Sequence, residues 1–149
     1  MKKSSGNKSI TNRRASFDYA LGEELLVGLV LTGGETKAAR LGHVHLKGSY
    51  VTVKDNELWL INASFSVMTG ERGGGKTVET RSRKLLAKRA QIDKLIKAKK
   101  DGLTIVPIRL LNQRNFIKLV IATGRGKKRY DKREAIKKRE QEREARRNF

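Results

Sequence analysis

The residues that most directly suggest chemistry form a glycine-rich stretch from Gly70 to Thr77. The sequence Gly-Glu-Arg-Gly-Gly-Gly-Lys-Thr matches the P-loop pattern, in which a glycine is followed after four residues by Gly-Lys-Thr. In a P-loop the backbone N–H groups and the lysine hold the phosphates of a nucleotide, and the hydroxyl binds magnesium. The pattern therefore raises the hypothesis of a small nucleotide hydrolase.

The surrounding sequence does not support nucleotide binding. A P-loop connects a strand to a helix that follows it directly, inside a parallel sheet. Here Val78, Glu79 and Thr80 delay any helix, and the neighbouring apolar segments are typical of antiparallel hairpins. No apolar strand ending in aspartate follows to hold the metal. We therefore interpret the stretch as a connection between a sheet and a helix.

Other chemistry-bearing side chains are sparse. His43 and His45 lie two residues apart on a predicted strand and therefore share a face. The chain has no cysteine, and no acid stands near the histidines at ligand spacing, so we predict a surface or RNA-facing pair and no metal site. No serine has a nucleophile-elbow context, and no two carboxylates stand out as an acid–base couple. We expect no enzymatic activity and no cofactor.

Positive charge dominates the composition. The 149 residues carry 35 Lys or Arg against 15 Asp or Glu, for a net charge of +20. Such an excess goes far beyond what solubility requires and indicates a polyanionic partner such as nucleic acid. Between residues 81 and 100 one acid, Asp93, opposes nine cations, which favours a phosphate-facing surface over a merely solvated one. These cations are Arg81, Arg83, Lys84, Lys88, Arg89, Lys94, Lys97, Lys99 and Lys100.

The C-terminal segment, residues 125–149, is also strongly basic, with twelve cations against five acids and a local charge of +7. A helix is predicted after Tyr130 because Asp131 and Glu134 have capping-box spacing and the residues that follow are good helix formers. The few apolar residues form no stripe, and a helix that buries no face is marginal alone in water. We predict a tail that is disordered when free and helical when bound to a polyanion.

Strand patterns occupy most of the remaining sequence. Asp55-Asn56 predicts a hairpin turn, and a second hairpin is predicted across residues 112–115. Pro107 suggests that its strand lies at a sheet edge or begins its pairing late. The predicted strands cover residues 17–21, 25–31, 44–53, 57–62, 63–68, 103–111 and 116–122.

Two helices are predicted among these strands, one over residues 35–41 that ends at Gly42 and one over about residues 83–100, capped by Thr80 or Ser82. The fold class is therefore mainly β with helices: a small OB-like antiparallel β-barrel with two or three helices and the basic C-terminal tail. The predicted organisation, along the chain, is a disordered basic arm over 1–11, an RNA-binding barrel over 12–124 and the tail over 125–149.

Several short stretches, taken in order, resemble one protein family. Each is weak alone, but the ordered set, spanning about residues 12–147, resembles the SmpB family (small protein B, the SsrA-binding protein) of bacterial trans-translation. The resemblance implies an oligonucleotide-binding barrel, no catalysis, and binding to the tRNA-like domain of transfer-messenger RNA. The matching stretches are Asn12-Arg-Arg-Ala15, Gly28 to Arg40, Ser49-Tyr50-Val51, Arg81 to Leu86 and Gly126 to Arg133.

The resemblance also implies contact residues. Glu35, Lys37 and Arg40 match the family's Glu-x-Lys-x-x-Arg element, which faces the elbow of the tRNA-like domain; spacing alone equally allows Glu35 to be a helix N-terminal acid. Tyr130 can stack on a base or pack against the barrel. The predicted RNA-binding residues are Asn12, Arg13, Glu35, Lys37, Arg40, Lys84, Lys127, Lys128, Tyr130, Asp131, Lys132 and Arg133. The tail cations assigned to the ribosomal channel are Lys137, Lys138, Arg139, Arg143, Arg146 and Arg147.

We therefore predict an adaptor whose barrel binds transfer-messenger RNA and whose tail enters the empty messenger channel of a stalled ribosome. The expected partners are that RNA, the ribosome and its small-subunit RNA, with one monomer per RNA. No membrane partner is expected, because the N-terminus lacks the apolar stretch of a signal peptide and the run Leu25–Leu31 is too short to cross a bilayer. We therefore expect a cytoplasmic location.

The alternative to the adaptor is a ribosomal or general single-stranded nucleic-acid-binding OB protein. The small number of aromatic residues disfavours this alternative.

Overall fold

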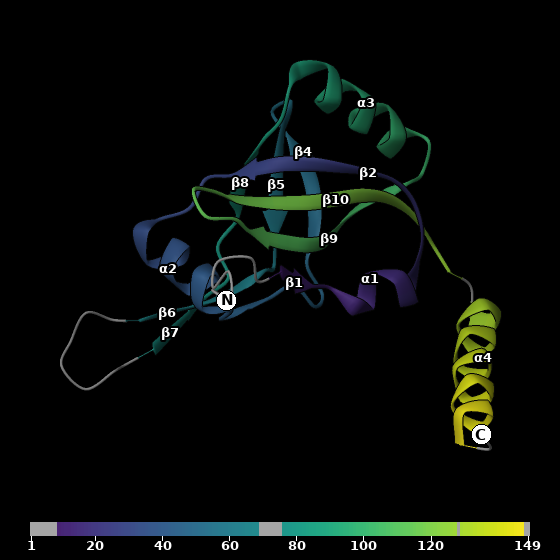
Figure 1. Ribbon diagram of the computed structural model, residues 1–149. Coiled ribbons are helices and arrows are strands. Elements are labelled where there is room, and N and C mark those ends of the chain that lie inside the picture. The colour runs from purple at the N-terminus through teal and green to yellow at the C-terminus, as the bar shows by residue number, and fades with distance from the viewer. Residues whose placement is uncertain (1–8, 69–75, 128, 148–149) are drawn as a thin grey trace.

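The computed structural model describes residues 9–68, 76–127 and 129–147, apart from the side chains of residues 129–131 and 135. The described residues form a mainly β fold with helices around it, as predicted (Figure 1). The elements are β1 (Ser9–Thr11), α1 (Arg13–Asp18), β2 (Tyr19–Leu29), α2 (Gly33–Leu41), β3 (Val44–His45), β4 (Tyr50–Lys54), β5 (Glu57–Ile61), β6 (Ser64–Met68), β7 (Lys76–Glu79), β8 (Arg83–Leu86), α3 (Arg89–Lys100), β9 (Thr104–Asn112), β10 (Ile117–Gly126) and α4 (Arg129–Arg147).

One antiparallel sheet curls into a barrel. Its order is β1-β9-β10-β2-β8-β5-β4, and β4 meets β9 again through the single pair Val51–Ile105, so the barrel is OB-like with a thin seam. A second small sheet, β3-β6-β7, extends beside it. Because side chains alternate across a strand, one face of each barrel strand fills the interior. The fully buried residues of this core include Val27, Val51, Leu58, Leu60, Ile105, Leu110, Leu119 and Ile121.

Both predicted hairpins are confirmed. In the β4–β5 hairpin, Asp55 and Asn56 have φ values of 53° and 59°, as a two-residue turn that follows the twist of the strands requires. The β9–β10 hairpin pairs Asn112 with Ile117.

The edge position predicted from Pro107 is wrong. β9 pairs with β1 and β10 and also meets β4. The register shifts beside the proline, since Val120 pairs with Arg109 whereas Ile121 pairs with Pro107. The extra residue, Ile108, makes a bulge, which lets proline sit in an interior strand although it donates no hydrogen bond.

The helix predicted over residues 35–41 is confirmed as α2. The Thr32 side chain accepts a hydrogen bond from the Glu35 N–H, the Glu35 carboxylate accepts one from the Thr32 N–H, and Gly42 ends the helix at φ 80°. The second predicted helix begins too early: α3 starts at Arg89, and residues 83–86 form β8. Arg83 and Leu85 lie two residues apart on this strand, and both face the interior and are buried. The apolar residues that follow have helical spacing, which hides this short strand in the sequence.

The N-terminal part also differs from prediction. Residues 9–11, inside the predicted arm, form β1 against β9. The predicted strand over 17–21 is replaced by the end of α1 and the start of β2, because α1 buries Ala15 against the barrel. The predicted strand over 44–53 is interrupted by a turn in which Gly48 has φ 77° and the Ser49 N–H donates to the Leu46 carbonyl.

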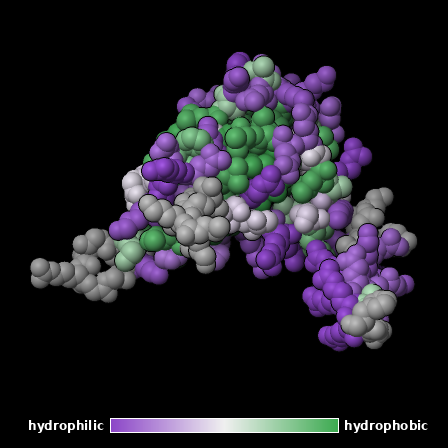
Figure 2. Space-filling view, in the orientation of Figure 1, coloured by the Kyte–Doolittle hydropathy of each residue, from purple (hydrophilic) through white to green (hydrophobic). Residues whose placement is uncertain are grey.

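The C-terminal segment is helical from residue 129 to residue 147, where the sequence predicts a helix. At about 1.5 Å per residue it is roughly 28 Å long, and it projects away from the barrel (Figure 1). The face of α4 seen in Figure 2 is almost wholly hydrophilic, and its described side chains are exposed except for half-buried Lys132. That the segment is disordered when free stays a prediction.

Candidate nucleic-acid interface

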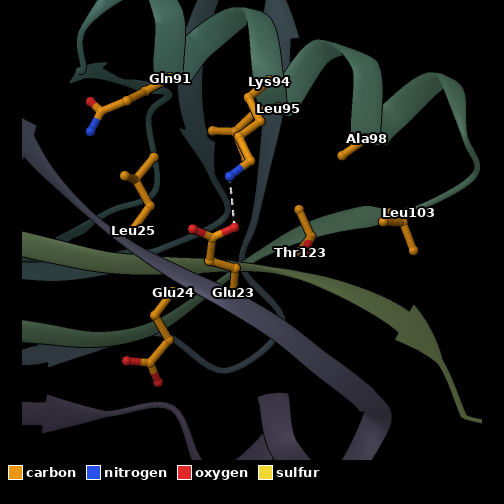
Figure 3. A pocket seen from close by; sticks show the side chains of 9 residues that line it. All are labelled: Glu23, Glu24, Leu25, Gln91, Lys94, Leu95, Ala98, Leu103 and Thr123. Atoms are coloured by element: carbon orange, nitrogen blue, oxygen red, sulfur yellow. Dashed lines mark hydrogen bonds and ion pairs between the residues drawn. The ribbon is translucent and has the colours of Figure 1, made fainter.

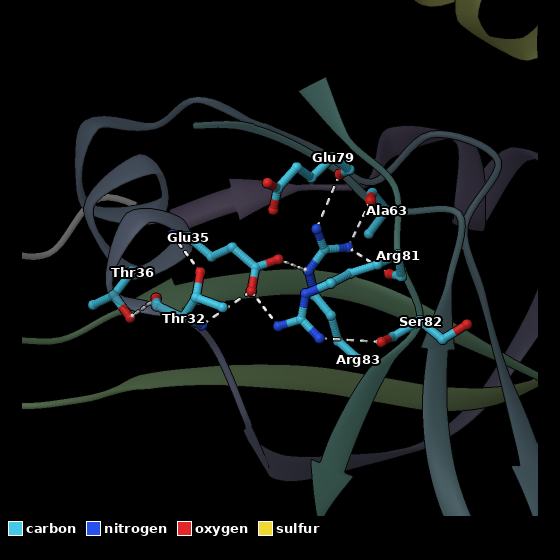
Figure 4. Close-up of polar contacts among 8 residues, drawn as sticks. All are labelled: Thr32, Glu35, Thr36, Ala63, Glu79, Arg81, Ser82 and Arg83. Carbon is cyan, nitrogen blue, oxygen red and sulfur yellow. Dashed lines mark hydrogen bonds and ion pairs between the residues drawn. The ribbon is translucent and has the colours of Figure 1, made fainter. Parts of the chain in front are cut away.

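A buried ion network fixes α2 to the barrel (Figure 4). The Glu35 side chain has no exposed surface, and its carboxylate accepts hydrogen bonds from the Arg81 and Arg83 guanidinium groups as well as from the Thr32 N–H at 3.0 Å. Arg83 is equally buried, whereas Arg81 is 43% exposed. The network therefore links the first turn of α2 to β8 and to the residues that precede it.

The other N–H groups of Arg83 are satisfied by backbone carbonyls. Nη1 donates to the carbonyls of Ala63 and Arg81, and Nη2 donates to that of Glu79, each at 2.9 Å. The guanidinium carbon also lies 4.0 Å from the centre of the Phe65 ring, which adds a cation–π contact. One arginine thus holds the ends of β5, β6 and β7 around the first turn of α2.

The Glu35 carboxyl is held in its ionised form. Burial has the largest influence and raises its pKa, but the hydrogen bonds from Arg81, Thr32 and Arg83 together outweigh burial, and the pKa lies below its ordinary value. Burial also lowers the pKa of Arg83 against the opposing effect of Glu35, yet a guanidinium stays charged in proteins. The pair is therefore ionic at neutral pH.

In this structure Glu35 has no exposed surface to offer an RNA. Both carboxylate oxygens face arginines, and none of the side chain reaches solvent. Its role is to position α2, whose outer side carries the other two predicted residues. Lys37 is exposed, and Arg40 is exposed with its Nη1 donating to the Asn112 side chain at 3.3 Å.

Of the two predicted N-terminal contacts, Asn12 is likewise buried and Arg13 is exposed. Asn12 is buried, its side chain donates to the Pro107 carbonyl at 2.9 Å, and its N–H donates to the Ile108 carbonyl at 2.7 Å. Through these bonds Asn12 holds the bulge of β9, so its side chain serves the fold. Arg13, the next residue, is exposed.

The start of α4 is attached to α1. Lys127 donates from its N–H to the Asp18 carbonyl at 2.8 Å and from Nζ to the Ser16 carbonyl at 2.9 Å. Lys132 Nζ lies 3.2 Å from Asp18 Oδ1, so one acid joins two basic helices. The cations Arg14, Arg139 and Lys132 lie 5.0, 5.7 and 6.0 Å from the centre of the Phe17 ring.

The sequence analysis did not identify Phe17 and Asp18 as the residues of α1 that contact the tail. The available signal was an aromatic residue followed by an acid in an otherwise basic segment. Lys128 lies outside the described residues. The side chains of Tyr130 and Asp131 do too, so their proposed RNA contacts stay predictions.

The remaining predicted residues lie on the surface. Lys84 Nζ pairs with Glu57 at 2.9 Å, which partly neutralises it. The tail cations are exposed along α4: Arg133, Lys137, Lys138, Arg139, Arg143, Arg146 and Arg147. α4 therefore presents positive charge on several sides at once.

The described residues do not form a nucleotide or metal site. Residues 70–75 of the P-loop-like stretch lie outside the described part, but Lys76 and Thr77 begin β7, which pairs antiparallel with β6. A hairpin therefore replaces the strand–loop–helix unit that a P-loop needs. Half-buried His43 precedes β3 and exposed His45 lies in it, and no cluster of three metal-ligating side chains occurs in the described residues.

A cleft of about 440 Å³ lies between α3 and β2 (Figure 3). Its lining is mostly apolar but includes Glu23 and Glu24, and Glu23 pairs with Lys94 at 2.7 Å. These carboxylates disfavour a polyanion there. None of the described helices is long and apolar enough to cross a membrane.

Breaking the buried network should destabilise the barrel. Glu35→Ala leaves the Arg83 charge buried without its partner, which should lower the free energy of unfolding by about 3–5 kcal/mol. The matched control, Glu57→Ala, removes the partly exposed partner of Lys84 and should cost less than about 1 kcal/mol. Urea unfolding of both variants checks this, and equal losses would show that the network does not hold the fold.

The same pair predicts a pH dependence. Because the pKa of Glu35 is lowered in the folded state, its ionised form contributes stability that is present above the ordinary glutamate pKa of about 4.3 and is lost as the pH falls through the lowered value. The difference in unfolding free energy between the wild type and Glu35→Gln should therefore be constant from neutral pH down to about 5 and shrink below about 4. Urea melts across this range measure it, and a difference that grows in acid would contradict the assignment.

Comparisons with known proteins place the chain in a family. The model of the SmpB protein family matches residues 9–149. An SsrA-binding protein of Trichormus variabilis is 42% identical over 147 residues, covering 97% of this chain and 95% of the relative. One of Helicobacter hepaticus is 46% identical over 137 residues, covering 91% and 88%.

A solved structure described as "tmRNA-SmpB: a journey to the center of the bacterial ribosome" is also similar. It has a TM-score of 0.63 and 35% identity, and the match covers 86% of this chain and 94% of that one. The OB-like barrel, the basic surface and these matches agree, and this chain belongs to the SmpB protein family.

Proposed function

We propose that this protein binds transfer-messenger RNA and acts as an adaptor of trans-translation on stalled ribosomes. The observation that carries the proposal is the 42% identity to an SsrA-binding protein across 97% of the chain. Similarity of that extent includes the barrel, α2 and the tail together. The net charge of +20 supplies the electrostatic attraction that such an RNA requires.

The proposed function divides between two parts of the chain. The barrel, whose strands run from Ser9 to Gly126, binds the tRNA-like domain, and the C-terminal segment with α4 enters the messenger channel left empty in a stalled ribosome. Support for this division comes from α4, which projects from the barrel and meets it through α1. Its exposed cations can neutralise small-subunit RNA phosphates along roughly 28 Å.

The physical basis of the proposal is mimicry. A barrel with a bound tRNA-like domain would occupy the space of a tRNA, and a cationic helix would find its site only where messenger is missing. One monomer per RNA suffices for this arrangement. We propose that the protein acts in the cytoplasm, where ribosomes work, and that it performs no chemical step itself.

Truncation after Tyr130 should separate the two activities. The barrel keeps its core and the Lys127 bonds to α1. Its melting temperature should change by less than about 3 °C, because none of the apolar side chains described beyond Tyr130 is buried. Binding to the isolated tRNA-like domain should persist, whereas release of stalled ribosomes should be abolished. Loss of both activities together would assign the tail to the primary RNA site and contradict the division.

Two full-length variants provide matched controls for the truncation. Replacing the cations Lys137, Lys138 and Arg139 with Gln should impair release, because phosphate contacts are lost. Replacing the acids Glu140, Glu142 and Glu144 with Gln changes the same number of charges in the same helix and should preserve release.

A further inference from the structure

An aromatic ring is exposed at the tip of the β9–β10 hairpin. Phe116 is 47% exposed and belongs to neither buried cluster of the core. The Lys118 ammonium lies 5.6 Å from the centre of its ring. An exposed phenylalanine adds little to the core, and the cation beside it suits contact with a ligand that carries both aromatic and anionic groups.

The hairpin tip is fixed against α2. Arg40 Nη1 donates to the Asn112 side-chain oxygen at 3.3 Å and to the Gln113 carbonyl at 3.1 Å, and Asn112 Nδ2 donates back to the Arg40 carbonyl at 3.3 Å. The Gln113 N–H donates to the Phe116 carbonyl at 3.0 Å, which closes the turn. Figure 1 shows α2 beside this hairpin. The backbone that carries the ring is therefore fixed before a ligand arrives, which lowers the entropic cost of binding.

Further cations lie on α2 and on the hairpin that carries the ring. Lys37 lies one turn before Arg40 on the same side of α2, and Arg114 is exposed at the hairpin tip. The acid of α2, Glu35, is buried and paired, and residues 112–118 contain no acid. We call this set the α2–hairpin surface: Lys37, Arg40, Arg114, Phe116 and Lys118.

We propose that the α2–hairpin surface binds an unpaired nucleobase of a folded RNA by stacking it on the Phe116 ring. Lys37, Arg114 and Lys118 then contact the phosphates on either side of that base. Sequence-specific and structure-specific RNA recognition commonly uses splayed-out bases on aromatic rings. The inference rests on the proposed function in that it takes the ligand to be a structured RNA, and it adds which chemical group of that RNA is held.

The proposal predicts an effect of the ring that is distinct from the effect of charge. Stacking contributes about 5- to 150-fold in affinity per base, so Phe116→Ala should weaken binding to the isolated tRNA-like domain by at least that lower factor. Phe116→Trp should keep the affinity, and Phe116→Leu should lose it as Ala does. The salt dependence of binding should not change in Phe116→Ala but should fall in Lys118→Gln, which removes a phosphate contact.

Tyr50 provides a matched control. It is 42% exposed, and it precedes Val51, which meets the opposite end of β9 from the hairpin. Tyr50→Ala should leave RNA affinity unchanged, and all variants should retain the wild-type melting temperature.

Fluorescence gives a direct readout, because Trp59 is the only tryptophan of the chain. In the double variant Trp59→Phe, Phe116→Trp, RNA should quench the single tryptophan if a base stacks on it. Wild-type affinity in Phe116→Ala or Phe116→Leu, or absence of quenching despite binding, would overturn the stacking proposal and leave the proposed function intact. Failure of the wild type to bind the tRNA-like domain would instead overturn the proposed function.

Discussion

The buried pair of Glu35 and Arg83 is the constraint on which the rest of the structure depends. Neither side chain has exposed surface, and a buried charge that loses its partner costs several kcal/mol. The pair is satisfied only when the first turn of α2, β8 and the ends of the β6–β7 hairpin are all in place. A single ionic contact thereby requires the barrel, the small second sheet and α2 to assemble together.

This constraint links the fold to RNA binding. Glu35 does not present its charge to a ligand; it fixes the helix whose outer side carries Lys37 and Arg40. Arg40 in turn fixes the β9–β10 hairpin. The barrel thus presents a fixed surface on α2 and residues 112–118 that carries no exposed acid. By contrast α4 attaches mainly at α1, and the described apolar side chains of α4 are exposed. A fixed barrel surface suits the proposed binding of a folded RNA, and a projecting α4 suits the proposed entry into the messenger channel.

The fold class and both hairpins were predictable because they depend on local signals: alternation, the Asp55-Asn56 turn and the Gly42 helix end. β8 was not predictable, because Arg83 is an interior residue only through a carboxylate 48 positions away. The resemblance implies an RNA contact for Glu35, and spacing alone equally allows a helix N-terminal acid, but neither shows that the side chain is buried. The pattern of cations identified the kind of partner, and the contacts of Phe17 and Asp18 with the tail depend on tertiary packing alone.

The identity of the RNA that the protein holds in cells tests the central claim most directly. Crosslinking of the full chain in growing cells, followed by sequencing of the attached RNA, reports every partner at once. We expect one structured RNA with a tRNA-like domain to dominate, together with small-subunit ribosomal RNA crosslinked through the α4 segment. A broad mixture of unstructured RNA without a dominant species would contradict the claim and identify a general single-strand-binding protein.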